Sequence, residues 1–212
     1  MRRILVLAVT IGLSTSALAM QVGSYVGLGA GVGKIKTPDQ NAFNGAGTTA
    51  SHSLGGFSGR AFAGFTVNSF FGVEAGITRY ARSYYQGQQG GNTSTLSFYS
   101  HTYDVVGKLY LPLAHSGFNL YALGGAARVA MTEHYNNQGV PNSGVIVTPL
   151  NPTTHYYSTR PIYGAGVGFE FGSNISANVE YTQIRYNGTF SNNSSATPNM
   201  DMITANLAYH IC

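Results

Sequence analysis

The chain alternates apolar residues with small or polar residues at a period of two over most of its length. Val26, Leu28, Ala30 and Val32, for example, are separated by single glycines. Because successive side chains of a β-strand point to opposite faces, this period predicts strands, and the helical period is nearly absent. Eight strands are predicted, near residues 22–34, 55–67, 70–80, 97–112, 118–132, 157–172, 175–186 and 200–212.

The connections between these predicted strands alternate between short and long. Three are tight turns, near residues 67–69, 114–117 and 172–174. Four are long and rich in Asn, Ser, Thr and Gly, at about residues 35–54, 81–96, 133–156 and 187–199. Short turns at one end and long loops at the other are typical of an outer-membrane barrel. The predicted fold class is all-β: a closed eight-stranded antiparallel up-and-down transmembrane β-barrel.

The alternation alone does not say which face of the barrel is inside, since a soluble lipocalin-like barrel would bury the apolar face. The other face combines glycines with large charged groups, as in Gly72, Glu74 and Gly76. Glycine weakens a solvated strand, whereas in the narrow lumen of an eight-stranded barrel it makes room for large side chains. The apolar face lacks charge, as lipid requires. We therefore expect it to face lipid, in the fifth strand through Tyr121, Leu123, Ala127 and Val129.

The inner face carries a nearly balanced set of charges, which predicts a network of buried ion pairs. Balanced pairs can hold one another, whereas an unpaired buried charge is costly. The network is interpreted as a plug that fills the lumen; the alternative is a gate that opens a pore for small solutes. Its predicted members are Arg60, Glu74, Asp104, Lys108, Arg128, Glu170 and Glu180.

A second set of cations falls at the predicted outer ends of the strands or just beyond them. Arginine binds phosphate through two parallel hydrogen bonds, and the outer leaflet of a Gram-negative outer membrane carries lipopolysaccharide phosphates. We expect a lipopolysaccharide-contacting rim; the alternative is a polar rim that is merely solvated. The residues are Lys34, Lys36, Arg79, Arg82, Arg160 and Arg185.

The first segment and the composition agree with export to the outer membrane. Arg2 and Arg3, the apolar run 4–13 and the small residues at 17–19 predict a signal peptide over residues 1–19. The barrel domain would then cover 20–212. Charged residues make up 8% of the chain, against about 25% in ordinary soluble domains. A net charge of +4 is too weak for a nucleic-acid binder.

Motifs for catalysis, cofactors and metals are not found, so we expect no enzyme activity, no cofactor and no metal site. The glycine-rich stretch 27–34 lacks the spacing of a phosphate-binding loop. His52, His134 and His155 fall in three predicted outer loops, without metal-ligand spacing. They are interpreted as solvated loop residues. Cys212 is the only cysteine, so an intrachain disulfide is excluded.

The chain resembles the small OmpA/OmpX-type outer-membrane β-barrel family over essentially all of its length after the signal peptide. It departs from the family at its end, where Cys212 stands in place of a final aromatic residue. The resemblance implies a cell outer-membrane barrel of eight strands. It rests on residues 25–31 (YVGLGAG), 72–76 (GVEAG), 120–126 (LYALGGA), 163–170 (YGAGVGFE) and 179–181 (VEY).

The function expected from these features is a structural and surface-exposed role in the outer membrane of a monomeric protein. The long outer loops are polar, rich in Ser and Asn, and contain interspersed aromatic residues, a composition that resembles adaptable recognition surfaces; these residues are Tyr84, Tyr85, Tyr135, Tyr156, Tyr157 and Phe190. They could make the protein a surface antigen, or an adhesin for a host or matrix molecule. A narrow porin-like channel is the alternative, and an outer-membrane enzyme ranks last.

Overall fold

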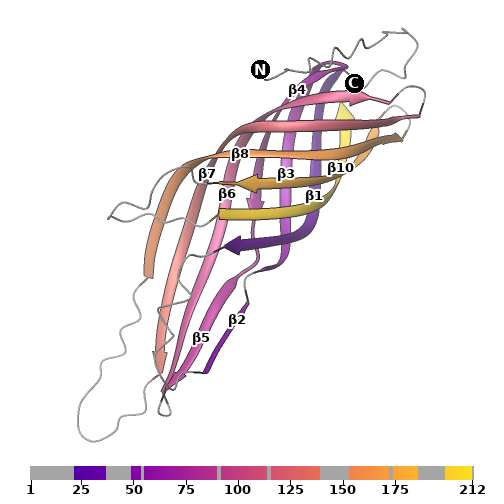
Figure 1. Ribbon diagram of the computed structural model, residues 1–212. Helices are drawn as coiled ribbons and strands as arrows, with labels where there is room; N and C mark the ends of the chain where they lie inside the picture. The colour runs from indigo at the N-terminus through magenta and orange to yellow at the C-terminus, as the bar shows by residue number, and fades with distance from the viewer. Residues whose placement is uncertain are drawn as a thin grey trace, which may run out of the picture.

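The protein consists of β-strands almost throughout the residues that its structure describes. A computed structural model describes residues 22–36, 49–53, 55–89, 92–113, 116–138, 153–171, 174–185 and 199–211. None of these residues forms a helix that could cross a membrane. The strands are β1 (Gly23–Lys36), β2 (Thr49–Ser53), β3 (Gly55–Asn68), β4 (Phe71–Arg79), β5 (Ser83–Gln89), β6 (Asn92–Pro112), β7 (Phe118–Gln138), β8 (Thr153–Phe171), β9 (Ile175–Ile184) and β10 (Asn199–Ile211) (Figure 1).

The strands form one antiparallel sheet that closes into an eight-stranded barrel. Around the barrel the order is β1, β3, β4, β6, β7, β8, β9 and β10, and β10 pairs again with β1. β5 follows β4 along the same edge of β6, and β2 pairs with β5, so these two short strands extend the barrel wall. The predicted fold class is therefore confirmed. The start of β1 and the end of β10 pair at the same end of the barrel.

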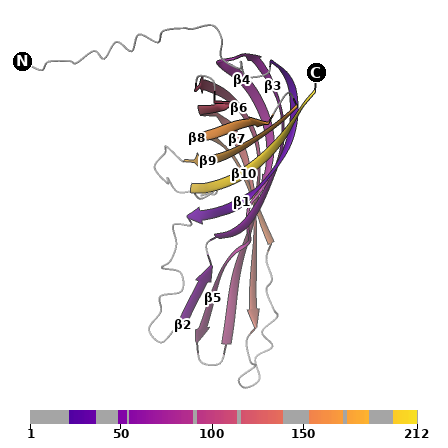
Figure 2. The same cartoon turned by 90° about the vertical axis from the view of Figure 1, so that its right-hand side faces the viewer.

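Part of the wall continues as a sheet well beyond the rest of the barrel. β6 and β7 have 21 residues each and β8 has 19, whereas about 9–11 residues of a tilted strand cross a membrane. With β5 and β2, these strands project past the ends of β1, β9 and β10 (Figure 2). We call the part formed by β2, β5 and the adjoining ends of β6, β7 and β8 the sheet extension.

The sheet extension occupies segments that the sequence predicted to be loops. Residues 83–89 (SYYQGQQ), for example, form β5 although they lack apolar alternation. Each strand of the extension pairs with a neighbour, so backbone hydrogen bonds hold it even where no apolar face has to be buried. The predicted strands are therefore too short: β6 begins at residue 92 and not 97, β7 continues to 138 and not 132, and β8 begins at 153 and not 157.

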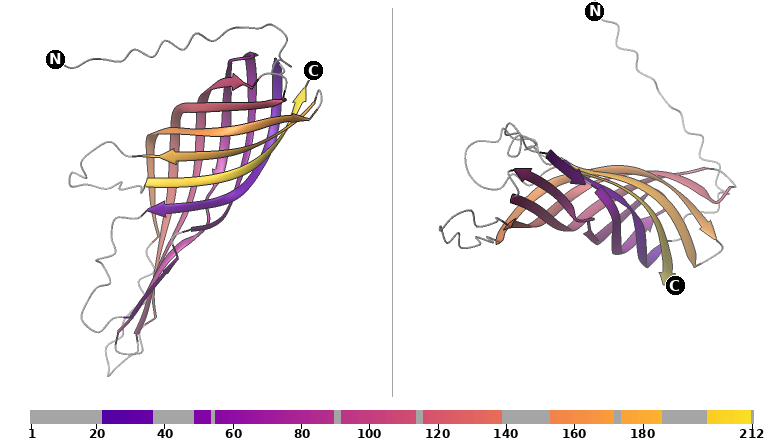
Figure 3. Two further views of the ribbon diagram at one scale, coloured as in Figure 1. Left: turned by 45° about the vertical axis from the view of Figure 1, so that its right-hand side comes forward. Right: turned by 90° about the horizontal axis from the view of Figure 1, so that it is seen from below.

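The apolar face of the barrel wall points outward, as the sequence predicted. Leu28 is 70% exposed, Val73 41% and Val167 45%, whereas the Glu74 carboxylate beside Val73 is buried inside. At the end near the chain termini, the ring of Phe169 contacts those of Phe118 and Phe171, with centroids 4.5 and 4.7 Å away. An outer surface of this kind requires lipid to cover it. Figure 3 shows the curvature of the wall.

Two of the inward-facing glycines make room for tyrosine rings. A Cβ atom built on Gly64 would collide with the ring of Tyr25, and one built on Gly166 would collide with the ring of Tyr121. The combination of glycine with large side chains on one face therefore reflects close packing across a narrow lumen.

The predicted facing of β7 is wrong. Tyr121 and Leu123 point into the lumen, whereas Ala122 and Arg128 point outward. Residues 127 and 129, which we also expected at the lipid surface, are completely buried. The reason is pairing with β6, where Leu123 lies opposite the inward-facing Lys108, because cross-strand partners share a face.

Candidate functional site

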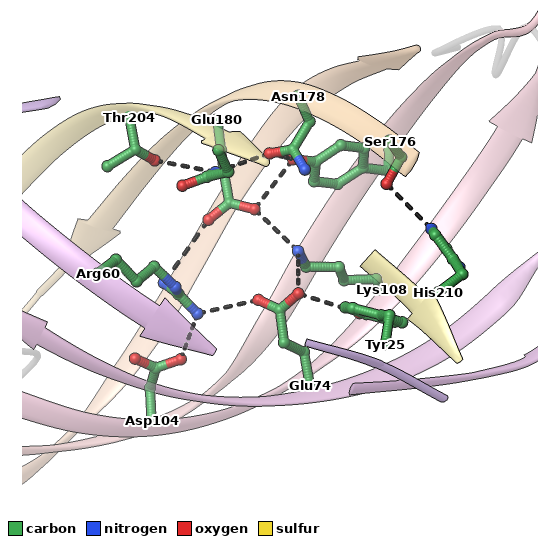
Figure 4. Close-up of polar contacts among 12 residues, drawn as sticks. Tyr25, Arg60, Glu74, Asp104, Lys108, Ser176, Asn178, Glu180, Thr204 and His210 are labelled. Carbon is green, nitrogen blue, oxygen red and sulfur yellow. Dashed lines mark hydrogen bonds and ion pairs between the residues drawn. The ribbon is translucent and has the colours of Figure 1, made fainter. Parts of the chain in front are cut away.

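Five charged side chains from four strands meet in the middle of the lumen (Figure 4). Arg60 contacts Glu74 at 3.0 Å, Asp104 at 2.7 Å and Glu180 at 3.6 Å. Lys108 contacts Glu74 at 2.7 Å and Glu180 at 3.0 Å. Each of these side chains is at most 4% exposed. The network joins β3, β4, β6 and β9 across the barrel rather than along its wall.

Tyrosine hydroxyls add hydrogen bonds to two of the carboxylates. Tyr25 donates a hydrogen bond to Glu74, and Tyr121 donates one to Glu180, each at 3.0 Å. Tyr121 also reaches the side-chain oxygen of Asn178, which accepts a second bond from Asn206 at 2.7 Å. The lumen is therefore filled by a connected polar network, and such networks are costly to break at a single member.

Two residues predicted for this network lie elsewhere. Arg128 is on the outward face of β7, with its guanidinium 5.7 Å from the ring centroid of Tyr157. This placement follows from the corrected facing of β7. Glu170 is only partly buried and lies at the end of the lumen near the chain termini. It lines a small cavity there, together with Tyr25 and His210.

On the other side of the ion-pair network, toward the sheet extension, apolar side chains fill the lumen. They come from β1, the end of β4, β7, β8, β9 and β10, and they pack in one cluster. The cavity at the opposite end has a volume of about 30 Å³, room for only one or two water molecules. Five members of the cluster lie level with the ion-pair network or below it: Val106, Tyr110, Tyr121, Leu123 and Ala127. We call the other seven the apolar layer: Ile35, Tyr80, Val129, Ile162, Ile184, Met200 and Met202.

The cations predicted for the rim do not form one ring. Arg79 and Lys34 are exposed on the outward face, whereas the side chain of residue 36 lies outside the described part. Arg185 is bound to Asp201 at 2.6 Å. Arg160 is 4% exposed and donates a hydrogen bond from Nε to Ser158 at 3.0 Å.

The prediction for Arg160 is therefore wrong. The residue shares the inward facing of Gly164, Gly166 and Gly168, at even positions of β8. That alternation was visible in the sequence and could have identified Arg160 as an inner residue.

A continuous group of side chains on the outward face of β4, β6, β7 and β8 was not predicted from the sequence. Arg82 lies 5.4 Å from the ring centroid of Tyr99, and His134 packs edge-on against the same ring at 5.5 Å. His101 packs in the same way on Tyr103. We call this group the Arg–Tyr–His face; it comprises Arg79, Arg82, Tyr99, His101, Tyr103, Arg128, His134, His155 and Tyr157.

Two of the predicted loop histidines belong to this face and are ordered by threonines. Nδ1 of His134 lies 3.0 Å from the Thr153 hydroxyl, and Nδ1 of His155 lies 3.1 Å from the Thr132 hydroxyl. The side chain of His52 lies outside the described part. Within the described residues, no group of three or more His, Cys, Asp or Glu side chains is arranged to hold a metal ion.

The opposite face of the sheet extension begins with an apolar patch. Phe98 and Met131 are buried, and Leu96 and Tyr156 pack against them. Desolvation raises the pKa of the Tyr156 hydroxyl, and the nearby Glu133 carboxylate adds to the increase. Tyr156 therefore stays neutral at physiological pH. The sheet extension thus has one aromatic and cationic face and one more apolar face.

Comparisons with known proteins agree with this architecture. The family model for the outer membrane protein beta-barrel domain matches residues 5–210. An uncharacterized protein of Coxiella burnetii is 28% identical over 177 residues, which cover 73% of this chain and 68% of that protein.

Solved structures with the same fold include Ail, the attachment invasion locus protein of Yersinia pestis, with a TM-score of 0.50 and 14% identity, covering 91% of this chain and all of Ail. The N-terminal barrel domain of Pseudomonas aeruginosa OprF has a TM-score of 0.50 and 10% identity, covering 90% of this chain and all of that domain.

Proposed function

Because the chain belongs to the family of outer membrane protein β-barrel domains, we propose that it acts at the cell surface through its sheet extension and not through its lumen. The barrel resides in the outer membrane, with the short turns and both chain ends at the periplasmic side. The sheet extension then projects outside the cell. The observation that carries the proposal is the length of β6, β7 and β8, which have 21, 21 and 19 residues.

The proposed role is adhesion to, or recognition of, a host or matrix molecule. The sheet extension offers a broad surface with two different faces, held in place by backbone pairing with the barrel wall. Its side chains include Tyr84, which is 38% exposed, and the partly buried Leu96, and tyrosine is a residue type that binding surfaces favour. The barrel closes on itself and leaves no free strand edge in the membrane, which supports a monomer.

The lumen supports this choice over a porin-like channel. A solute would have to pass the ion-pair network formed by Arg60 and Lys108 with three carboxylates. It would then have to cross the apolar layer, in which Ile35, Ile184 and Met200 are at most 1% exposed. Opening one obstacle would leave the other, so the lumen is better suited to stabilise the barrel than to conduct.

A shortened variant tests the proposal. Ser83 pairs with Phe98, and Glu133 pairs with Thr154, so each pair can be joined by an Asn-Gly turn after the residues between them are removed. Bacteria that display this variant should bind matrix-coated surfaces and cultured epithelial cells less than bacteria that display the full chain. Equal binding, with equal surface amounts, would contradict the proposal.

Two controls accompany that comparison. Folding of the shortened barrel is checked by its faster gel migration before boiling, which a folded membrane barrel shows. Both proteins are also inserted into planar bilayers, where we expect no steady pore openings. Regular openings by the full chain would favour the channel instead.

A further inference from the structure

The Arg–Tyr–His face carries three arginines that none of the described carboxylates offsets. None of the described ion pairs involves Arg79, Arg82 or Arg128. The described carboxylates lie elsewhere: Glu74, Asp104 and Glu180 in the lumen, Glu170 near the periplasmic end, Glu133 on the other face of the sheet extension and Asp201 beside Arg185. Like charges collected in this way repel one another, and an anion would relieve that repulsion.

Aromatic rings hold two of these arginines in place. The guanidinium of Arg82 lies over Tyr99 and donates a hydrogen bond to Ser97 Oγ at 2.7 Å. The guanidinium of Arg128 lies over Tyr157. A guanidinium that stacks on a ring keeps donors free for a second partner, and the planar fork of arginine matches a phosphate group. These arginines are therefore arranged in advance for an anionic ligand.

The residues of the Arg–Tyr–His face lie at the level of the outer membrane surface. Leu111 is near the periplasmic end of β6, and about ten residues separate it from His101, which is the length of strand that crosses the hydrocarbon core. Arg79 lies directly opposite His101, and Arg128 lies opposite Tyr103. The lower part of the face is thus at the outer boundary of the hydrocarbon. Tyr99 and His134 follow just above it, within the headgroup region.

The opposite side of the barrel lacks this arrangement. There Lys34 is paired across the strands with Asp201, and Asp201 also binds Arg185 at 2.6 Å. The nearby cations are therefore offset by an acidic side chain. Among the described residues at this height the distribution of charge is one-sided, with exposed arginines that form no described ion pair on the wall formed by β4, β6, β7 and β8.

We propose that the Arg–Tyr–His face binds the phosphorylated sugar headgroup of an outer-leaflet glycolipid, the lipopolysaccharide type, on this one wall of the barrel. Arg79, Arg82 and Arg128 contact phosphate oxygens. His101, His134 and His155 add hydrogen-bond donors, and the tyrosines pack on the sugar rings. The acyl chains of the same molecule lie along the apolar wall below, on Ile77 and Val105, which are 53% and 61% exposed. Binding of a glycolipid at this site is independent of the adhesion proposed for the sheet extension.

Binding of purified lipid A to the purified barrel tests the proposal. The barrel is held in phosphatidylcholine nanodiscs and titrated with bisphosphorylated lipid A or with the same lipid after enzymatic removal of its phosphates. The full chain should bind the bisphosphorylated form at least about tenfold more tightly, because charge-assisted contacts to phosphate are the strong ones. The triple variant R79Q/R82Q/R128Q should lose this preference.

A matched variant on the other wall separates a site from general positive charge. K34Q/R185Q removes two cations at a similar height and should change lipid A affinity by less than about twofold. A further variant, Y99L/Y157L, keeps all charges but removes the rings under the arginines, and should weaken binding several-fold. Gel migration before boiling confirms that each variant is folded.

Three outcomes would overturn the proposal. The first is equal loss of binding in the triple variant and in K34Q/R185Q, which would indicate nonspecific charge. The second is unchanged binding in the triple variant. The third is tighter, arginine-dependent binding of soluble heparin than of lipid A, which would assign the face to a sulfated polymer. None of these measurements involves cell adhesion, so this site and the role of the sheet extension succeed or fail separately.

Discussion

At the scale of single residues, Arg60 is the centre of the ion-pair network in the lumen. Its guanidinium reaches carboxylates from three other strands, at 3.0 Å to Glu74, 2.7 Å to Asp104 and 3.6 Å to Glu180. Burying these charges is expensive, and their mutual contacts offset that cost only while the set is complete. The network is therefore sensitive to the loss of any one partner.

Replacing Arg60 with Met should lower the free energy of unfolding by about 3–5 kcal/mol, because it leaves buried carboxylates without their partner. The measurement is urea unfolding of the barrel in phospholipid vesicles, followed by gel migration without boiling. The matched variant Arg128→Met removes an outward arginine and should change stability by less than about 0.5 kcal/mol. Equal effects of the two substitutions would show that the network contributes no more than a surface residue.

A glycine inside the lumen and a glycine on the outward face offer a second test at this scale. A Cβ on Gly166 would collide with the Tyr121 ring, whereas a Cβ on Gly124 would have nothing within 4 Å. Gly166→Ala should therefore destabilise the barrel by about 1–3 kcal/mol through overpacking. Gly124→Ala should be neutral or slightly stabilising, because it restricts the unfolded chain. Thermal unfolding in the same vesicles compares the two, and the reverse order would contradict the packing described.

At the scale of elements, β7 depends most on its neighbours. Small residues occur on both of its faces between Ala122 and Ala127, so its own sequence gives no clear facing. Pairing with β6 decides it: Tyr121 lies opposite Tyr110, and Leu123 lies opposite Lys108. Both partners point into the lumen, and the facing of Arg128 follows by alternation.

Spin labels can test the facing of β7 directly. In a background with Cys212→Ser, a nitroxide attached through Ala122→Cys should collide freely with oxygen dissolved in the bilayer, because residue 122 faces lipid. A label attached through Leu123→Cys should be shielded inside the lumen. Electron paramagnetic resonance relaxation measures both. Greater oxygen access at residue 123 than at residue 122 would support the facing of β7 that the sequence predicted.

At the scale of the whole molecule, the lumen has two obstacles in series. The ion-pair network lies in the middle, and the apolar layer lies between it and the sheet extension. β9 contributes to both, through Glu180 and Ile184, but no residue belongs to both, so removing one obstacle leaves the other in place. In the function proposed above, this arrangement keeps recognition at the cell surface separate from transport through the lumen.

Conductance of variants tests this series arrangement. Arg60→Met alone should remain silent in planar bilayers, because the apolar layer is intact, and Ile184→Ser/Met200→Ser alone should also remain silent. Only the combination of all three substitutions should give openings above the baseline rate. Steady openings in the Arg60→Met variant alone would mean that the network is itself the gate.

Much of the fold was predictable from local sequence, because a transmembrane wall imposes a strict period of two. Leu28 and Val73 face outward and Glu74 faces inward as the alternation indicated. The ends of β6, β7 and β8 were not predictable in this way. Outside the membrane both faces of a sheet can be solvated, so the apolar alternation stops although the backbone pairing continues.

The sequence by itself thus determined that the chain forms a closed barrel with glycines and charges inside, since only lipid outside and a narrow lumen inside satisfy that pattern. The tertiary structure alone decided which charges meet. Arg128 lies outside because the register of β7 with β6, and not the residue type, sets its face. Register joins residues that are far apart in the chain, and the side chains within one strand do not contain that information.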